Sequence, residues 1–528
     1  MKKLFSLLLC AALLSGCSRT VAEDPIAPQS ATEPIRKEIQ PFIAPVYESR
    51  FDSVTEIFLS DKGTIHNSTQ EGAVFLSHDI IYYEDRDTYK SGNPYGEGTD
   101  ADKHSAEEAA SHTVVNITAP GAYHITGTLS AGQIRVDLGK DAYEDPNAVV
   151  ELILDDADIT CTVAPAILFL NTYECDGNWS DETAGPEIDT SAAGSNLVLK
   201  GGSTVNGSYV AKIYKDKDGE KKLWKQDGAI YSYMSMNVFG PGTLELNAAN
   251  EGMGTELHLT INGGNITINS NNDGINTNED DVSVTAINGG NLAIFAGLGA
   301  EGDGIDSNGY LVINGGNVIA CAKPISDAGL DSNLGSFIHG GTVIAMGASM
   351  DWAESDSGQV TMNLQFAAQQ AACSDICITK ENGTEVFRFL PTGGTFREFS
   401  GLIISQPALK QGEAYHVYIN SEQMTYTGTD VIKGPGGFGI PPKDFAPDKL
   451  PEMPEDFDPS KLDGRGPRPD GQNMAPPEGF DDRFPQGMEP PQMPEGGFDS
   501  RDTIPAGKPH TEFYMNDMVN FFSGVTPA

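Results

Sequence analysis

Carboxylate and amide side chains recur in three related segments in the middle of this 528-residue sequence. The segments are Asp273–Asn278, Asp303–Asn308 and Gly329–Asn333, and in each a glycine is followed by an aliphatic residue and then by Asn or Asp. Because side chains alternate across a strand, the aliphatic residue can point inward while the polar residues beside it point outward. Strands stacked in register would therefore line up oxygen atoms in rows.

Rows of oxygen atoms suit calcium, which takes about six to eight ligands from carboxylates, amides and carbonyls. Without a cation, carboxylates that lie one strand apart would repel each other. The sequence therefore predicts bound Ca²⁺, with ligands from Asp273, Asn276, Asn278, Glu279, Asp280, Asp303, Asp306, Asp327 and Asp331. The alternative interpretation is that these are turn and ladder residues on a solvated acidic face.

A second repeat indicates the elements that carry these residues. Ile-Asn-Gly-Gly-Asn occurs at 261–265, 287–291 and 313–317, and Ile-His-Gly-Gly-Thr occurs at 338–342. After each Gly-Gly, apolar residues alternate with others at a period of two, which is typical of a strand with one buried face. Such strands at a constant step predict an all-β fold, a right-handed parallel β-helix (solenoid) over residues 113–350.

The segments around the repeat have different compositions. Residues 47–112 are polar and acidic, with short strands expected at 54–59 and 73–76, and residues 215–222 are expected to form a hairpin insertion. Residues 351–432 predict a small β-rich module that caps the β-helix. Its expected elements are strands at 376–379, 386–390, 402–405 and 415–420, and a short helix in the Ala-rich stretch 367–372.

The C-terminal part of the sequence is rich in Gly, Pro, Asp and Met. Residues 433–510 lack the apolar density that offsets the entropy of ordering a chain, so we expect this segment to be disordered. Residues 511–528 become apolar again, and we expect them to dock on the body of the protein.

The N-terminal residues are typical of an exported lipoprotein. Two lysines precede an apolar run from Leu4 to Leu14, which is too short to span a bilayer. The next residues, Leu-Ser-Gly-Cys, resemble a bacterial lipobox, in which Cys17 carries the lipid. We therefore expect a signal peptide over 1–16, a flexible tether over 17–46, and a protein held at the cell envelope by its lipid alone.

The composition limits the classes of partner. The chain has 33 Lys and Arg against 75 Asp and Glu, a formal net charge of −42, which disfavours nucleic acid and favours divalent cations.

The cysteines after Cys17 are sparse and do not indicate a disulfide framework, although Cys161 with Cys175, or Cys373 with Cys377, could pair.

The lipobox, the Ile-Asn-Gly-Gly repeats, the Asp-Gly-Ile segments, a β-rich module and a Gly/Pro/Met tail follow one another in this order. In that combination, residues 113–432 resemble a bacterial family of carbohydrate-binding domain-containing proteins. The resemblance implies a pectate-lyase-type β-helix that is loaded with calcium and binds cellulose and acidic glycans without cleaving them. Only the Asp-Gly-Ile segments match closely enough to transfer ligand positions, and the third copy has Ala328 where the resemblance implies Asp.

Two other functions are open to such a fold. A polysaccharide lyase needs a basic Lys or Arg beside calcium, but Lys323 is the one Lys or Arg between Gln226 and Thr379. The second alternative is a surface adhesin or structural protein. Aromatic platforms are the usual way to hold neutral sugars, and the candidates are Trp179, Trp224, Trp352, Tyr231 and Tyr233, although core packing would explain these residues equally well. We therefore expect calcium-dependent, non-catalytic binding of an acidic glycan, such as polygalacturonate, or of cellulose.

Overall fold

The computed structural model describes residues 42–429 and 508–528, except 62–64, 68–71, 84–94, 97–99, 178–179, 181–182, 218–219, 325 and 349–350. The predicted signal peptide, Cys17, most of the tether and nearly all of the predicted disordered segment lie outside the described residues. In the described part, no helix is long and apolar enough to cross a membrane. The structure is mostly β, with long parallel sheets, as the repeats predicted.

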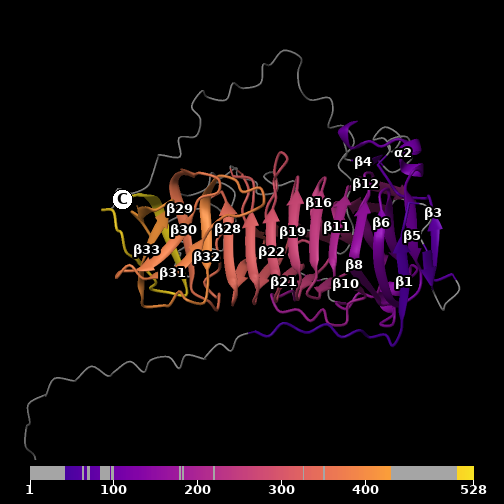
Figure 1. Ribbon diagram of the computed structural model, residues 1–528, viewed down its shortest axis with the longest axis horizontal. Helices are drawn as coiled ribbons and strands as arrows, with labels where there is room; N and C mark the ends of the chain where they lie inside the picture. The colour runs from indigo at the N-terminus through magenta and orange to yellow at the C-terminus, as the bar shows by residue number, and fades with distance from the viewer. Residues whose placement is uncertain are drawn as a thin grey trace, which may run out of the picture. The chain divides into compact units, whose positions relative to one another are not determined.

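Three ladders of stacked strands make up the body. Ladder 1 contains β1 (Val54–Leu59), β6 (Gly121–Leu129), β8 (Val150–Thr160), β10 (Ser195–Leu199), β15 (Met236–Phe239), β18 (Leu259–Ile261), β21 (Val284–Ile287), β24 (Tyr310–Ile313) and β27 (Ser336–Ile338). Ladder 2 continues from the second half of β8 through β11 (Gly202–Gly207), β16 (Thr243–Ala248), β19 (Asn265–Ser270), β22 (Asn291–Phe295), β25 (Asn317–Cys321) and β28 (Thr342–Gly347). Figure 1 shows these strands side by side.

Ladder 3 carries the polar segments. It contains β3 (Val74–Ser77), antiparallel to β5 (Thr113–Ile117), and then the parallel strands β7 (Gly132–Asp137), β9 (Ile167–Asn171), β14 (Gly228–Ser232), β17 (Glu251–Thr255), β20 (Ile275–Thr277), β23 (Ile305–Ser307) and β26 (Leu330–Ser332). From β15 onward the chain visits ladders 1, 2 and 3 in turn and returns to ladder 1 beside its previous strand.

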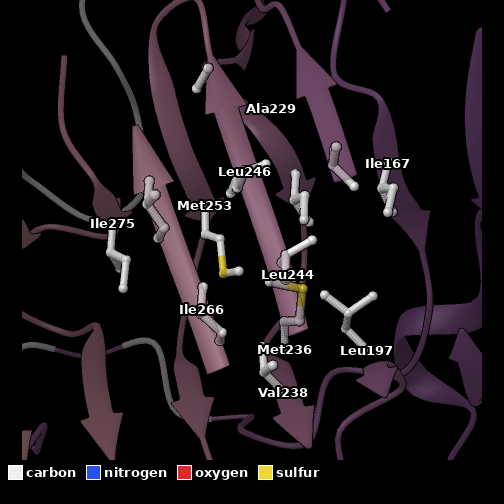
Figure 2. Packing of buried hydrophobic residues seen from close by; sticks show 14 of the residues in the cluster. Ile167, Leu197, Ala229, Met236, Val238, Leu244, Leu246, Met253, Ile266 and Ile275 are labelled. Atoms are coloured by element: carbon white, nitrogen blue, oxygen red, sulfur yellow. The ribbon is translucent and has the colours of Figure 1, made fainter. Parts of the chain in front are cut away.

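The inward residues of each ladder form one continuous core. In ladder 2, Leu246, Ile268, Ile294, Ala320 and Ala345 stand in register on successive strands, and each is at most 3% exposed. Figure 2 shows how the residues of the earlier turns meet in the interior. This stacking confirms the expectation that apolar residues at a period of two point inward.

Small elements surround the ladders. These are β2 (Ile65–Asn67), β4 (Tyr95–Gly96), the hairpin of β12 (Val210–Lys217) and β13 (Glu220–Gln226), the short helix α2 (Ala106–Ala110), and two 3₁₀ turns at Asp100–Asp102 and Ala142–Glu144. The hairpin confirms the insertion expected at 215–222. The five described cysteines are free, so neither suggested pairing is present.

The last strand of ladder 2, β28, pairs antiparallel with β32 (Phe399–Ser405) of the C-terminal strands. The others are β29 (Thr361–Gln370), β30 (Ile376–Lys380), β31 (Glu385–Phe389), β33 (Ala414–Ile419), β34 (Glu422–Thr425), β35 (Phe513–Tyr514) and β36 (Val519–Pro527). The four strands expected here are confirmed, and β36 pairs with β29 and β34, which confirms that the end of the chain docks on the body.

The short helix expected at 367–372 was wrong. Residues 367–370 belong to β29, which pairs with β32 on one side and with β36 on the other. The pairing of residues 361–366 on both edges, with Gln370 paired to Phe399 at the end of the strand, outweighs the weak helix preference of a few alanines.

The stacked core makes a direct prediction. Ile268→Ala removes a fully buried side chain, so we expect the free energy of unfolding to fall by about 2–5 kcal/mol. Thr267→Ala, on the outward side of the same strand, is the matched control and should cost less than about 1 kcal/mol. Urea denaturation followed by circular dichroism measures both. Equal losses in the two variants would contradict the assignment of faces.

Candidate functional site

The outward face of ladder 3 brings the predicted polar residues together. Asn276, Asp306 and Asp331 occupy the same position on three successive strands. The aliphatic residue before each of them is fully buried. Neighbouring parallel strands lie about 4.8 Å apart, so these side chains form one row.

A second row lies at the turn that enters each strand. Oδ1 of Asp273 accepts a hydrogen bond of 2.7 Å from the backbone N–H of Asp303, and Oδ1 of Asp303 accepts one of 2.5 Å from the N–H of Ala328. Each carboxylate therefore caps the next turn of the stack. Ala328 ends the series, because it supplies an N–H and has no carboxylate of its own.

The glycine of the Asp-Gly pairs permits this stacking. A Cβ atom on Gly274 would lie 2.5 Å from the carbonyl oxygen of Gly304, and one on Gly304 would lie 2.4 Å from that of Gly329. No side chain fits at such distances. The recurrence of glycine after the acidic residue is thus a requirement of the close approach between turns.

The row begins one turn earlier than the sequence analysis recognised. Register places Glu251 two residues before Met253, as Asp273 lies two residues before Ile275. Oε1 of Glu251 accepts a hydrogen bond of 3.0 Å from Nδ2 of Asn276. We call the six residues Glu251, Asp273, Asn276, Asp303, Asp306 and Asp331 the acidic strip.

Two buried oxygen atoms of the acidic strip have no hydrogen-bond partner among the described residues. They are Oε2 of Glu251 and Oδ1 of Asn276. Glu251 is 4% exposed and Asn276 is 7% exposed. An unpaired buried oxygen of this kind costs free energy, which a cation or a proton can offset.

The electrostatics of the strip reflect crowding of like charges. Burial, followed by the charges of Asp331 and Asp273, raises the pKa of Asp303 to about 9. Burial and the charges of Asp273 and Asp331 raise the pKa of Asp306 to about 8. Burial is also the main reason that the pKa of Asp273 rises to about 6, and it raises the pKa values of Asp331 and Glu251. Without a compensating cation, the strip therefore holds protons near neutral pH.

Lys225 is a functional candidate that the sequence analysis missed. Its Nζ lies 2.9 Å from Oδ2 of Asp227 and donates a hydrogen bond of 2.5 Å to Oδ1 of Asn278. Burial alone would lower the pKa of Lys225, but the charges of Asp227 and Glu251 outweigh burial and raise it. Lys225 precedes the first of the Gly-containing ladder 3 strands of this region and lies just outside the stretch from Gln226 to Thr379. The repeat of an acidic residue before Gly252, Gly274 and Gly304 could have identified Glu251.

The remaining predicted ligands lie around the strip. Oδ1 of Asn278 already accepts a hydrogen bond from Lys225. Oδ2 of Asp327 accepts a hydrogen bond of 2.9 Å from the N–H of Gly302. Asp280 is exposed and accepts a hydrogen bond of 3.0 Å from Nδ2 of Asn308, with Glu279 beside it. Among the described residues, no three His, Cys, Asp or Glu side chains already surround a common point as a metal site would require.

The aromatic candidates that the structure describes, Tyr231, Tyr233 and Trp352, do not form a platform. Tyr231 is fully buried, its hydroxyl donates to Glu256, and the ring of Tyr233 packs edge-on against it at 5.4 Å. Trp352 packs against the core. Trp179 and the side chain of Trp224 lie outside the described residues.

Comparisons with known proteins identify the family to which this sequence is similar. Residues 111–374, half of the chain, match a family described as carbohydrate-binding domain-containing protein. A protein of Acetivibrio thermocellus with the same name is 33% identical over 172 residues, which cover 32% of this chain and 50% of that protein. The chain thus spans about half the length of this curated relative.

A solved structure is similar at a lower level. It is a polysaccharide lyase-like protein from C. thermocellum, determined as a gadolinium derivative. It has 22% sequence identity and a TM-score of 0.33, and the match covers 55% of this chain and 94% of that one.

The raised carboxyl pKa values predict a pH-dependent stability in the absence of cations. Asp303 and Asp306 have pKa values of about 9 and about 8 in the fold, against about 3.9 in an unfolded chain. Between these values the folded state binds more protons than the unfolded state. Raising the pH from about 5 to about 8 should therefore lower the free energy of unfolding, by up to about 1.4 kcal/mol per pH unit for each group.

Calorimetry in a chelator at the two pH values measures this effect. Asp303→Asn combined with Asp306→Asn should flatten the pH dependence. Asp158→Asn, on the exposed outward side of ladder 2, is the matched control and should leave it unchanged. An unchanged slope in the double variant would show that the strip is not its source.

Proposed function

Because this chain belongs to the family of carbohydrate-binding domain-containing proteins, we propose that it binds polysaccharide and does not cleave it. We propose further that calcium on the acidic strip makes acidic glycans, such as polygalacturonate, its ligands. The observation that carries the calcium proposal is the buried row of carboxylate and amide side chains, in which Oε2 of Glu251 and Oδ1 of Asn276 lack partners among the described residues.

The donor chemistry of the strip fits calcium. Every candidate atom is a carboxylate or amide oxygen, which is the kind of ligand that this cation prefers. Glu251, Asn276 and Asp306, with Asp273, Asp303 and Asp331 beside them, would hold the ion. Since no three of the acidic side chains converge as they stand, binding requires them to rotate toward one another. A bound cation would supply positive charge to a face that otherwise repels anions.

The residues of the strip themselves would orient the glycan. The strand backbone of ladder 3 keeps Asp306 and Asp331 one strand apart, so successive carboxylates repeat along the face at about 4.8 Å. Lys225 is a permanent positive charge at one end of the strip, held by Asp227. A polyuronate carboxylate would meet attraction there and at the cation, and repulsion elsewhere.

Among the described residues, the two lysines of these turns, Lys225 and Lys323, are both engaged by other groups, which supports binding without cleavage. Proton abstraction next to a uronate carboxylate needs a neutral amine or a similar group. Lys225 has a raised pKa and remains protonated. Nζ of Lys323 donates a hydrogen bond of 2.5 Å to the carbonyl oxygen of Gly299, which holds it against the backbone. A calcium-dependent lyase is therefore the less supported function.

We also propose that the body is a closed β-helix and that the protein is attached to the cell envelope. The regular return of the chain through ladders 1, 2 and 3 supports a closed, right-handed β-helix. The lipobox-like sequence before Cys17 supports export and attachment to the cell envelope by lipid. At a cell surface, such a protein would hold glycans outside the cell.

Binding of polygalacturonate should require calcium. Pull-down with the insoluble polymer should succeed with calcium and fail with a chelator, because the face is then only acidic. Asp306→Asn combined with Asp331→Asn should weaken binding at least about tenfold, or about 1.4 kcal/mol, whereas Asp158→Asn should not. Calcium should also stabilise the fold by about 2.7 kcal/mol at a hundredfold excess over Kd. Binding that survives the chelator would refute calcium-mediated recognition, and failure to bind any glycan would favour a structural role.

The chain should release no unsaturated uronate from polygalacturonate. Ultraviolet absorbance of the product, followed at alkaline pH with calcium, measures elimination directly. A known pectate lyase in the same buffer serves as the positive control. Turnover that disappears in Lys225→Ala or Lys323→Ala would overturn the assignment and make this protein an enzyme.

A further inference from the structure

A segment without regular secondary structure crosses the outside of ladder 1. This segment, residues 42–50, is called the strap here, and in Figure 1 it runs in indigo along the lower edge of the sheet toward β1. Its fastening point is Glu151, which is 2% exposed. The carboxylate accepts hydrogen bonds of 2.7 Å from Tyr47 Oη, 2.6 Å from Ser49 Oγ and 2.9 Å from the N–H of Arg50.

A cavity of about 790 Å³ lies between the strap and the sheet. Its floor contains Ile153 and Val198, which stand in the outward column of ladder 1. Outward positions of this column are polar in later turns, where Asn288 and Asn314 are joined by a hydrogen bond of 2.9 Å. The apolar floor is therefore local to the cavity.

The opposite wall is also apolar. Pro45 and Val46 of the strap line it, and Val46 is 84% exposed. The ring of Tyr47 packs on Phe239 at a centroid distance of 5.7 Å and supports this end of the strap. A ligand in the cavity would thus meet apolar groups on both of its faces.

A network of charged side chains borders one end. Nδ1 of His124 lies 2.6 Å from Glu56, and its Nε2 lies 2.8 Å from Asp155, which also pairs with Lys200 at 2.9 Å. Burial alone would lower the pKa of His124, but the hydrogen bonds to Asp155 and Glu56 raise it. Because both ring nitrogens of His124 face carboxylates, which only accept hydrogen bonds, the contacts hold the imidazole in its charged form, and the charges of His124 and Lys200 balance those of Glu56 and Asp155. Unlike the acidic strip, this end has no net charge.

We propose that this cavity is a second glycan site, which takes a neutral pyranose end without calcium. This inference takes only the ligand class, carbohydrate, from the proposed function. A pyranose with equatorial hydroxyls has two apolar faces and a polar edge, which match the floor, the strap and the charged network. Glu56 and Lys200 are 57% and 60% exposed in their side chains, so they can accept and donate hydrogen bonds to hydroxyl groups. A charged ligand gains no net electrostatic attraction from a network in which the positive and negative charges cancel.

Isothermal titration of the purified chain with cellotetraose, in the presence of a chelator, tests the site. Binding is expected, and Glu56→Gln combined with Lys200→Ala should weaken it at least tenfold. Both side chains are largely exposed, so the melting temperature should stay unchanged. Ile153→Trp, which fills the cavity from an outward position, should abolish binding and is the second variant.

The acidic strip supplies the matched control. Asp306→Asn with Asp331→Asn should leave cellotetraose binding intact while it removes calcium-dependent binding of polygalacturonate. Failure of one site is thereby distinguished from failure of the other. No binding of cellotetraose, binding that persists in both cavity variants, or preference for a galacturonate oligomer over cellotetraose in the chelator would each overturn the proposal.

Discussion

In-register stacking of parallel strands is the constraint on which the rest of this structure depends. Each residue of ladders 2 and 3 lies beside its counterpart one turn away, at about 4.8 Å. The stacking places side chains of the same kind beside one another on every face of the ladders. It is favourable in the interior, where Ile268 meets Ile294, and for amides, where Asn291 donates a hydrogen bond of 2.7 Å to Asn265. For carboxylates it is unfavourable, because their charges repel.

The same constraint explains what could be predicted from the sequence. A period of two within strands and a constant step between them identified the buried face, the outward row of Asn276, Asp306 and Asp331, and the long parallel sheets. Glu251 was missed because its turn has Met253 and Gly254 in place of Ile and Asn, so the local pattern is broken although the register continues.

Other features depend on contacts between residues far apart in the sequence. Lys225 ends the hairpin insertion, and only the fold brings it to Asn278 of a later turn. The strap has no periodicity, and its position follows from one buried carboxylate, Glu151, more than a hundred residues away. At residues 367–370, the continuation of a strand that pairs with distant strands replaced the expected helix. Such contacts have no signature in local sequence.

The energetic cost of the acidic strip points to its purpose. Asp273 and Asp303 each accept one backbone N–H from the next turn, but Oε2 of Glu251 and Oδ1 of Asn276 have no partner among the described residues, so other groups must satisfy the strip. Protons can do so only while the pH stays below the raised pKa values of Asp303 and Asp306. At higher pH the same oxygens need a cation, and their affinity for one rises as the protons leave. A fold that only needed turns could use Asn throughout, as ladder 2 does at Asn265, Asn291 and Asn317. The use of carboxylates instead of Asn in ladder 3 is the difference that motivates the proposed calcium site.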